Sequence, residues 1–122
     1  MSEKKINVVI IDDEHEILSM LESFLNRKKI YKVKTFNNPL SALERLPKET
    51  DLILLDVVMP QINGIDLLPK LKKRYPDVKI IIMTASSTLD TVLNAQRYGA
   101  NNYVMKPFES MDTIVDKIKV IL

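Results

Sequence analysis

Five polar residues of this sequence lie at the ends of short apolar runs and have the types needed for ion and phosphate chemistry. Asp12 and Asp13 follow one run, and Asp56 ends a second. Thr84 ends a third run, and Lys106 follows a fourth. Carboxylates that lie close together raise one another's pKa or need a cation beside them. Lys106 offers one cation, and magnesium suits a site with few carboxylates and several waters as a second.

A carboxylate beside a divalent cation, a lysine and a hydroxyl can hold a phosphoryl group. Phosphoryl transfer depends chiefly on positioning and on neutralising the equatorial oxygens, and a carboxylate can be the nucleophile. Asp56 is the expected acceptor because it stands alone at the end of a central run. Taken singly, Asp12 and Asp13 could equally cap a helix, and Lys106 could be a solvated lysine. The combination of all these residues favours the chemical interpretation.

The elements that must position these residues begin with five predicted strands. The runs at 6–12, 51–56 and 79–84 are apolar and nearly unbroken, which is typical of strands buried on both faces. The runs at 31–36 and 102–105 are weaker, and the first carries lysines on one face. Lysines on one face indicate an edge strand, so we expect these two runs at the edges of a sheet.

Amphipathic segments alternate with the strands and predict five helices. Their apolar stripes cover residues 17–25, 40–46, 65–71, 89–93 and 111–121. Ser110 is the expected N-cap of the last helix, and Ser87 or Thr88 that of the fourth. Regular alternation predicts a doubly wound α/β fold, in which a five-stranded parallel sheet in a three-layer α/β/α arrangement has strand order 2-1-3-4-5. Ligands of such sheets bind beyond the carboxyl ends of the strands, where the five polar residues fall.

Composition excludes several other classes of protein. A length of 122 residues predicts one domain, residues 1–122. The absence of cysteine excludes disulfides and thiolate sites, and the single histidine excludes a histidine-rich metal site. A net charge of +2 gives no reason to expect nucleic-acid binding by this domain. No apolar run reaches the roughly 18 residues of a membrane span and no signal peptide is present, so we expect a cytoplasmic protein without membrane contact.

Four segments, at 9–14, 54–60, 81–85 and 99–108, occur in the order and register of one known family. Together with Gly64 they resemble the receiver domain of two-component response regulators, over the whole length of the chain. The resemblance implies a flavodoxin-like fold and a signalling phosphoacceptor rather than an enzyme. Its implied partners are a sensor histidine kinase or a histidine phosphotransfer protein, and a downstream protein target.

The resemblance also implies a role for each candidate site residue. Asp56 would accept the phosphoryl group. Asp13 and Asp56, with the backbone carbonyl of Val58, would bind magnesium or another divalent cation such as manganese. Asp12 would act through a metal-bound water. Lys106 would pair with a phosphoryl oxygen.

A switch is implied as well. The Thr84 hydroxyl would donate to another phosphoryl oxygen, helped by the backbone amide of Ala85, and the peptide bond before Pro107 would be cis. As Thr84 moves toward the phosphoryl group, Tyr103 would turn inward into the vacated space. The surface formed by residues 88–121 would then change partners. The candidate exposed contacts on it are Asn94, Arg97, Tyr98 and Lys117.

Two positions near the expected phosphate tune the lifetime of the phosphorylated state in this family. Val58 and Ser86 occupy them here. An apolar Val58 cannot orient an attacking water, so we expect slow dephosphorylation.

Other classes fit less well or stay open. A haloacid-dehalogenase-like phosphatase would carry a second aspartate where Val58 stands, and a flavodoxin would have a Ser/Thr/Gly-rich loop after the first strand. A nucleotide hydrolase would need a glycine-rich phosphate loop, which the sequence lacks. Two alternatives stay open: a receiver-fold docking module that works without phosphorylation, and a receiver fragment of a longer transcriptional regulator.

Overall fold

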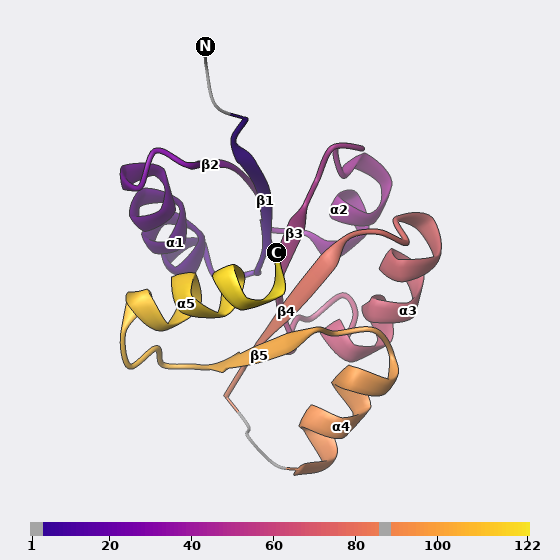
Figure 1. The fold of residues 1–122 in the computed structure, drawn as a ribbon. Coiled ribbons are helices and arrows are strands. Elements are labelled where there is room, and N and C mark those ends of the chain that lie inside the picture. The colour runs from indigo at the N-terminus through magenta and orange to yellow at the C-terminus, as the bar shows by residue number, and fades with distance from the viewer. Residues whose placement is uncertain (1–3, 86–88) are drawn as a thin grey trace.

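Five strands alternate with five helices in the computed structural model, which describes residues 4–85 and 89–122 (Figure 1). The strands are β1 (Ile6–Ile11), β2 (Tyr31–Phe36), β3 (Leu52–Asp56), β4 (Lys79–Thr84) and β5 (Asn102–Met105). The helices are α1 (His15–Arg27), α2 (Pro39–Arg45), α3 (Gly64–Arg74), α4 (Leu89–Arg97) and α5 (Met111–Ile121). Every element predicted from the sequence is present, with ends displaced by a few residues at most.

The strands form one parallel sheet in the order β2-β1-β3-β4-β5, which confirms the predicted topology. Every residue of β3 is buried, as expected for the central strand. The edge strand β2 exposes Lys32 and Lys34, and Val33 between them is half-buried. The chain leaves β1 toward β2 on one side and returns to β3 on the other. The carboxyl ends of β1 and β3 therefore flank the switch point of the sheet.

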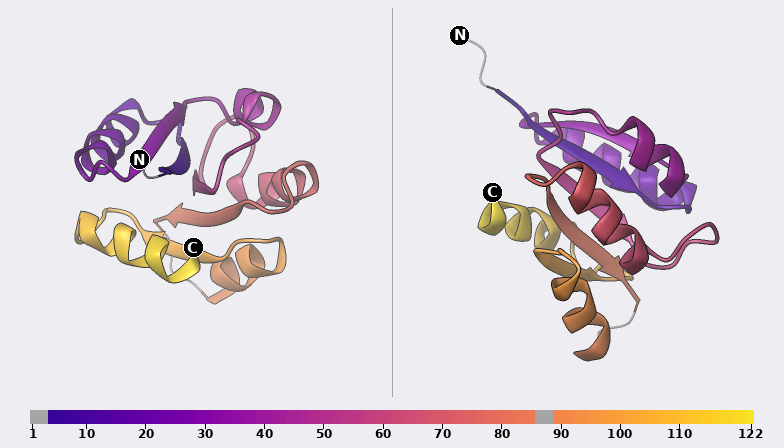
Figure 2. Two further views of the ribbon diagram at one scale, coloured as in Figure 1. Left: turned by 45° about the horizontal axis from the view of Figure 1, so that its top comes forward. Right: turned by 90° about the vertical axis from the view of Figure 1, so that its right-hand side faces the viewer.

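Helices cover both faces of the sheet (Figure 2), and alternate residues of the central strands pack toward opposite helical layers. Val8 and Ile10 of β1 pack in the cluster that includes α1 and α5. Val9 and Ile11 pack in the cluster that includes α2, α3 and α4. Strands buried on both faces have to be apolar at nearly every position, which is why the central runs of the sequence are unbroken. The arrangement confirms the predicted three-layer α/β/α fold.

Helix ends follow local capping chemistry. The Ser110 hydroxyl accepts a hydrogen bond from the Asp112 amide at 3.2 Å and caps α5, as predicted. The Asn38 side chain caps α2 by accepting from the Leu40 amide at 2.9 Å, a cap that was not predicted. Ser86 and the predicted caps of α4, Ser87 and Thr88, lie outside the described residues. No helix in the described part of the chain has the length and apolar character to cross a membrane.

Candidate functional site

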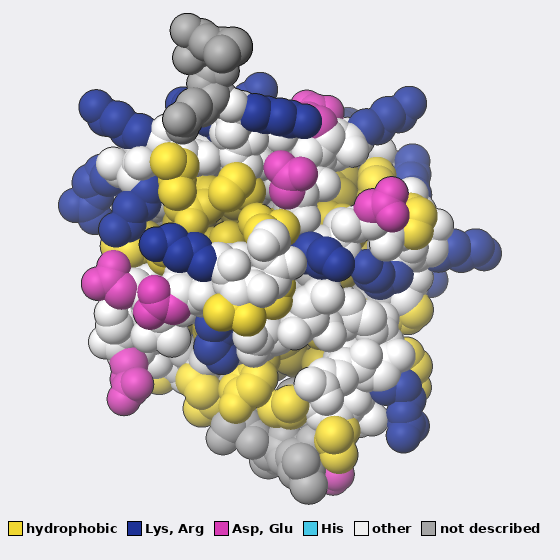
Figure 3. All heavy atoms as spheres, in the orientation of Figure 1, with side chains coloured by type: hydrophobic (Ala, Val, Ile, Leu, Met, Phe, Trp, Pro, Cys, Tyr) yellow, Lys and Arg dark blue, Asp and Glu magenta, His cyan; other side chains and the backbone are white. Residues whose placement is uncertain are grey.

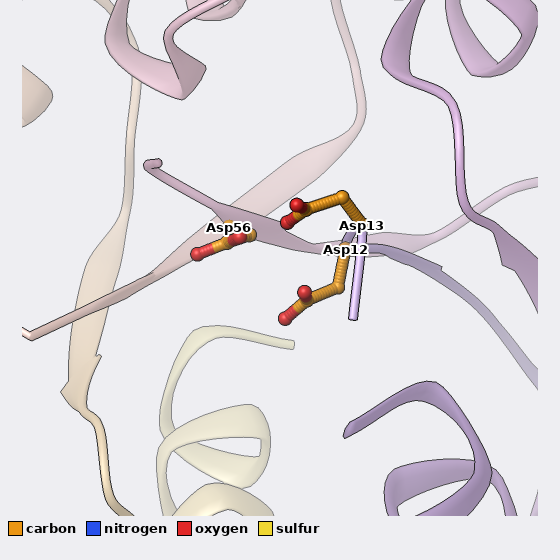
Figure 4. Close-up of side chains that lie close together, drawn as sticks. All are labelled: Asp12, Asp13 and Asp56. Atoms are coloured by element: carbon orange, nitrogen blue, oxygen red, sulfur yellow. The ribbon is translucent and has the colours of Figure 1, made fainter. Parts of the chain in front are cut away.

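Three aspartates meet beyond the carboxyl ends of β1 and β3 (Figure 4). Asp12 and Asp13 follow β1, and Asp56 is the last residue of β3. The two strands pair with Ile11 opposite Leu55, so the residues that follow these two leave the sheet at the same level. One carboxylate oxygen from each aspartate lies within 4.8 Å of the others. The fold thus brings together the acidic residues that the sequence placed at the ends of two strands.

The two neighbouring aspartates of β1 have different environments. Asp12 is 0% exposed, and its carboxylate accepts hydrogen bonds from the Glu14 amide at 2.9 Å and from Lys106 at 2.6 Å. Asp13 is exposed. The bond to the Glu14 amide organises the turn before α1, but Asp12 does not cap the helix, because the N-cap residue is Glu14 and no side chain caps it.

Lys106 supplies the positive charge of this cluster. Its Nζ lies 2.6 Å from Asp12 Oδ2, 3.2 Å from Asp56 Oδ1 and 3.5 Å from Glu14 Oε1. The Lys106 amide donates to the Thr84 carbonyl at 2.8 Å, and the Lys106–Pro107 peptide bond is cis. Burial favours the neutral amine, but the contacts with Asp12 and then Asp56 outweigh it and raise the pKa of Lys106. The contact with Glu14 was not predicted from the sequence.

The positive charge near the Asp56 carboxyl is too small to keep its pKa at the ordinary value. Burial and then the neighbouring Asp12 carboxylate raise its pKa to about 7, although Lys106 acts in the opposite direction. Among the described residues, the Lys106 ammonium alone faces the carboxylates of Asp12, Glu14 and Asp56, so this acidic cluster can accept a further cation. Three carboxylate oxygens within reach of one another are a donor set that suits a hard divalent ion such as magnesium.

The connection from β3 to α3 keeps Asp56 in place. The Gly64 amide donates to the Val57 carbonyl at 2.7 Å, and the Val57 amide donates to the Met83 carbonyl at 3.1 Å. A Cβ on residue 64 would overlap the Asp56 carbonyl oxygen, so only glycine allows α3 to begin this close to the strand. Val58, two residues after Asp56, is 72% exposed. Its side chain is apolar and therefore offers no polar group near Asp56.

β4 and β5 carry the other candidate residues to the same edge of the sheet. Thr84 is buried at the end of β4, and Ala85 after it is exposed. Met83 pairs with Asp56, so Thr84 lies one residue beyond Asp56 on the neighbouring strand. Tyr103 of β5 is half-buried and packs against the cluster on the α2, α3 and α4 face.

The sequence predicts Lys117 as an exposed contact, but the residue is half-buried. Its ammonium turns toward the free edge of β5. There it donates to the Tyr103 carbonyl and, at 3.4 Å, to Asn102 Oδ1, and it lies 4.4 Å from the centre of the Tyr103 ring. The prediction was wrong because an edge strand presents unpaired carbonyls that attract a lysine. The other three predicted contacts, Asn94, Arg97 and Tyr98, are exposed.

Comparisons with known proteins identify the family of this chain. The family "Response regulator receiver domain" matches residues 8–119. The transcriptional regulator NtrC of Proteus hauseri is 37% identical over 112 residues, which cover 91% of this chain and 24% of that protein. The chain spans 22% to 47% of the length of the curated relatives that it matches.

Solved structures show the same fold. The chemotaxis protein CheY4 of Vibrio cholerae has a TM-score of 0.88 at 24% identity and covers 97% of this chain and 99% of its own. A beryllofluoride-activated NtrC4 receiver domain, solved as a dimer, has a TM-score of 0.84 at 31% identity and covers 93% of each chain. A response regulator of Burkholderia pseudomallei, solved with a phosphorylated aspartic acid and a calcium ion, has a TM-score of 0.81 at 25% identity and covers 95% of this chain and 72% of its own. This chain therefore belongs to the response regulator receiver domain family.

Proposed function

We propose that residues 1–122 act as the phosphoacceptor domain of a two-component system. Asp56 takes the phosphoryl group from the phosphohistidine of a sensor kinase or a histidine phosphotransfer protein, or from a small phosphodonor. A carboxylate oxygen of Asp56 attacks phosphorus, the phosphorus–nitrogen bond breaks, and the departing imidazole takes up a proton. The observation that carries the proposal is the contact of buried Asp56 with Lys106 at the switch point of the sheet, 3.2 Å between charged atoms.

Asp12, Asp13 and Asp56 would hold magnesium or manganese, with the backbone carbonyl of Val58 as a further ligand. The clustering of the three carboxylates supports this assignment, as does the related Burkholderia regulator, which was solved with a phosphorylated aspartic acid and a calcium ion. An ion held there would supply positive charge to the oxygens of the transferring group. Asp13 is the exposed member of the set and is open to an ion arriving from solvent.

The remaining residues would bind the oxygens of the phosphoryl group. The Lys106 ammonium is already 3.2 Å from Asp56 Oδ1, so a small movement brings it to a phosphoryl oxygen. Thr84 on the neighbouring strand would donate its hydroxyl to another oxygen, and the amide of Ala85 would assist. The backbone of β4 and β5 brings these donors close to Asp56 before the group arrives, so each has only a short distance to move, and such positioning lowers the barrier.

The output of the domain would be altered protein binding rather than catalysis. As Thr84 moves toward the phosphoryl group, Tyr103 turns inward, and the surface of residues 88–121 changes partners. We propose a cytoplasmic location and no direct nucleic-acid contact by this domain. A second candidate is the receiver segment of a longer transcriptional regulator, because the relative at 37% identity is named as one and the chain spans 24% of it.

The test is a mass measurement on the intact protein after incubation with acetyl phosphate and magnesium. We expect one added phosphoryl group on the wild type and none on Asp56→Asn. Chelation of the divalent ion should prevent the addition while the circular dichroism spectrum stays unchanged. No addition to the wild type with several donors would contradict the proposal and favour a docking module that works without phosphorylation.

A further inference from the structure

The free edge of β5 is covered by one lysine from α5. Basic and apolar side chains border one another over this face of the molecule (Figure 3). Lys117 reaches the edge and donates to the Tyr103 carbonyl and to Asn102 Oδ1 at 3.4 Å. The same ammonium lies 4.4 Å from the centre of the Tyr103 ring, well inside the range of a cation–π contact. One side chain thus contacts both the backbone and the ring of the residue that we propose as the switch.

The ammonium of Lys117 has no carboxylate partner within ion-pair distance among residues 4–85 and 89–122. Burial lowers its pKa. Among the described residues, its contacts are therefore a carbonyl oxygen, an amide oxygen and an aromatic face. Lys119 on the same helix is exposed and offers a natural comparison.

We propose that Lys117 is a positioning residue that holds the Tyr103 ring in the orientation of this structure and thereby sets how readily the ring turns inward. The inference rests on the proposed switch role of Tyr103. The hydrogen bond to the Tyr103 carbonyl does not depend on where the ring points, but the contact with the ring does. Rotation of the ring separates it from the ammonium, so Lys117 stabilises the present orientation over the inward one.

The size of the effect follows from the contact that differs between the two orientations. A partly desolvated cation–π contact shifts a two-state ratio about three- to tenfold. Removing the charge should therefore raise the inward population by that factor before any phosphoryl group is present. It should also speed phosphorylation by a small donor, because more of the protein already has the receptive arrangement.

The test uses the full chain labelled with 3-fluorotyrosine and observed by fluorine NMR, with the Tyr103 signal assigned through Tyr103→Phe. Lys117→Gln removes the charge but keeps an N–H donor for the carbonyl. Lys117→Arg restores a cation, and Lys119→Gln is the matched control on the exposed side of α5. Spectra are recorded without activator and again with beryllofluoride and magnesium, which mark the two ends of the shift.

We expect the Tyr103 signal of unactivated Lys117→Gln to move part of the way toward its activated position. Lys117→Arg and Lys119→Gln should stay at the wild-type position, and only Lys117→Gln should accept phosphate faster from acetyl phosphate. Equal spectra for Lys117→Gln and Lys119→Gln would overturn the inference, since Lys117 would then only protect the strand edge. A wild type that takes no phosphoryl group contradicts the proposed function instead, whereas a wild type that is phosphorylated without any movement of the Tyr103 signal overturns this inference alone.

Discussion

Two lysines beside β5 are both partly buried, yet their surroundings differ. Lys106, just beyond the carboxyl end of the strand, touches three carboxylates, and its pKa is raised. Lys117, which reaches the free edge of the strand from α5, touches two neutral oxygens and a ring, and its pKa is lowered by burial. The groups that contact an ammonium, rather than its burial, thus decide its role. Lys106 neutralises carboxylates, whereas Lys117 contacts the backbone and ring of Tyr103.

The difference has an energetic consequence. Two of the three carboxylates beside Lys106 are almost entirely withdrawn from solvent, since Asp12 is 0% exposed and Asp56 is 4% exposed. Removing one partner of a buried charge pair leaves the other uncompensated, which is costly. Removal of Lys117 leaves only neutral oxygens without their partner. They lie at a solvent-accessible edge, so water can replace the lost hydrogen bonds.

The largest expected effect is therefore the contrast between Lys106→Ala and Lys117→Ala. Without divalent cation at pH 8, Lys106→Ala should lower the free energy of unfolding by about 3 kcal/mol, and Lys117→Ala by less than about 1 kcal/mol. Urea denaturation measures both values. Added magnesium should restore part of the loss in Lys106→Ala, because the ion replaces the missing charge. Equal losses in the two variants would break the comparison.

A second prediction concerns the pH dependence that Asp56 contributes without divalent cation. Its pKa is about 7 in the folded state against an ordinary value of 3.8, so between these values the folded state holds more protons than the unfolded chain. The free energy of unfolding should then fall as the pH rises through this window. Asp56→Asn removes this effect and should be more stable than the wild type at pH 8.

The control for that prediction is the same pair of proteins near pH 4, where Asp56 is protonated in the folded state and the difference should nearly vanish. Added magnesium at pH 8 should also reduce it, by stabilising the charged form of the wild type. A stability difference independent of pH would mean that nearby positive charge already compensates the Asp56 carboxylate. It would refute the view that Lys106 faces more negative charge than it can neutralise.

A third prediction concerns the exposed apolar residue beside the acidic cluster. Val58 is 72% exposed and offers no polar group to an attacking water. Val58→Asn should shorten the lifetime of the phosphorylated state several-fold, because the amide can orient that water. Loss of phosphate from the purified phosphoprotein measures the lifetime, with Val58→Ala as the control that adds no polar group. Unchanged decay in Val58→Asn would disprove the role of this position.

The smallest effect is expected at a third kind of lysine. Lys28 forms a surface ion pair with Asp112 at 3.8 Å, in which the side chains are 40% and 75% exposed. Solvent screens such a pair, so Lys28→Ala should change the free energy of unfolding by less than about 0.5 kcal/mol. Urea denaturation at low and high salt measures it. A loss comparable to that of Lys106→Ala would show that exposure does not distinguish the lysines of this domain.

Much of the fold could be predicted from the sequence because its periodicities are simple. Apolar runs buried on both faces identified β1, β3 and β4, and weaker runs identified the edges. The carboxyl-end rule then placed Asp12, Asp56 and Lys106 at one edge of the sheet before any distance was known. These predictions succeed because each depends on a local pattern and one general rule of topology.

The contacts of Lys117 and Glu14 could not be predicted in the same way. Each depends on the path of a long side chain between elements, from α5 to the edge of β5 or from Glu14 to Lys106. Helical periodicity placed Lys117 on the polar side of α5 and gave no sign of the unpaired carbonyl within its reach. Side-chain contacts across elements depend on packing geometry, which a single sequence does not encode as a local pattern.

The central claim is that the phosphoryl group is carried by Asp56 and by no other carboxylate of the cluster. Reduction of the phosphorylated protein with borohydride converts an aspartyl phosphate to an alcohol, and peptide mass spectrometry then locates the altered residue. We predict that the alteration is found at Asp56 alone and that it requires both the phosphodonor and magnesium. Alteration at Asp12 or Asp13, or none at Asp56 in a protein that gained phosphate, would contradict the account.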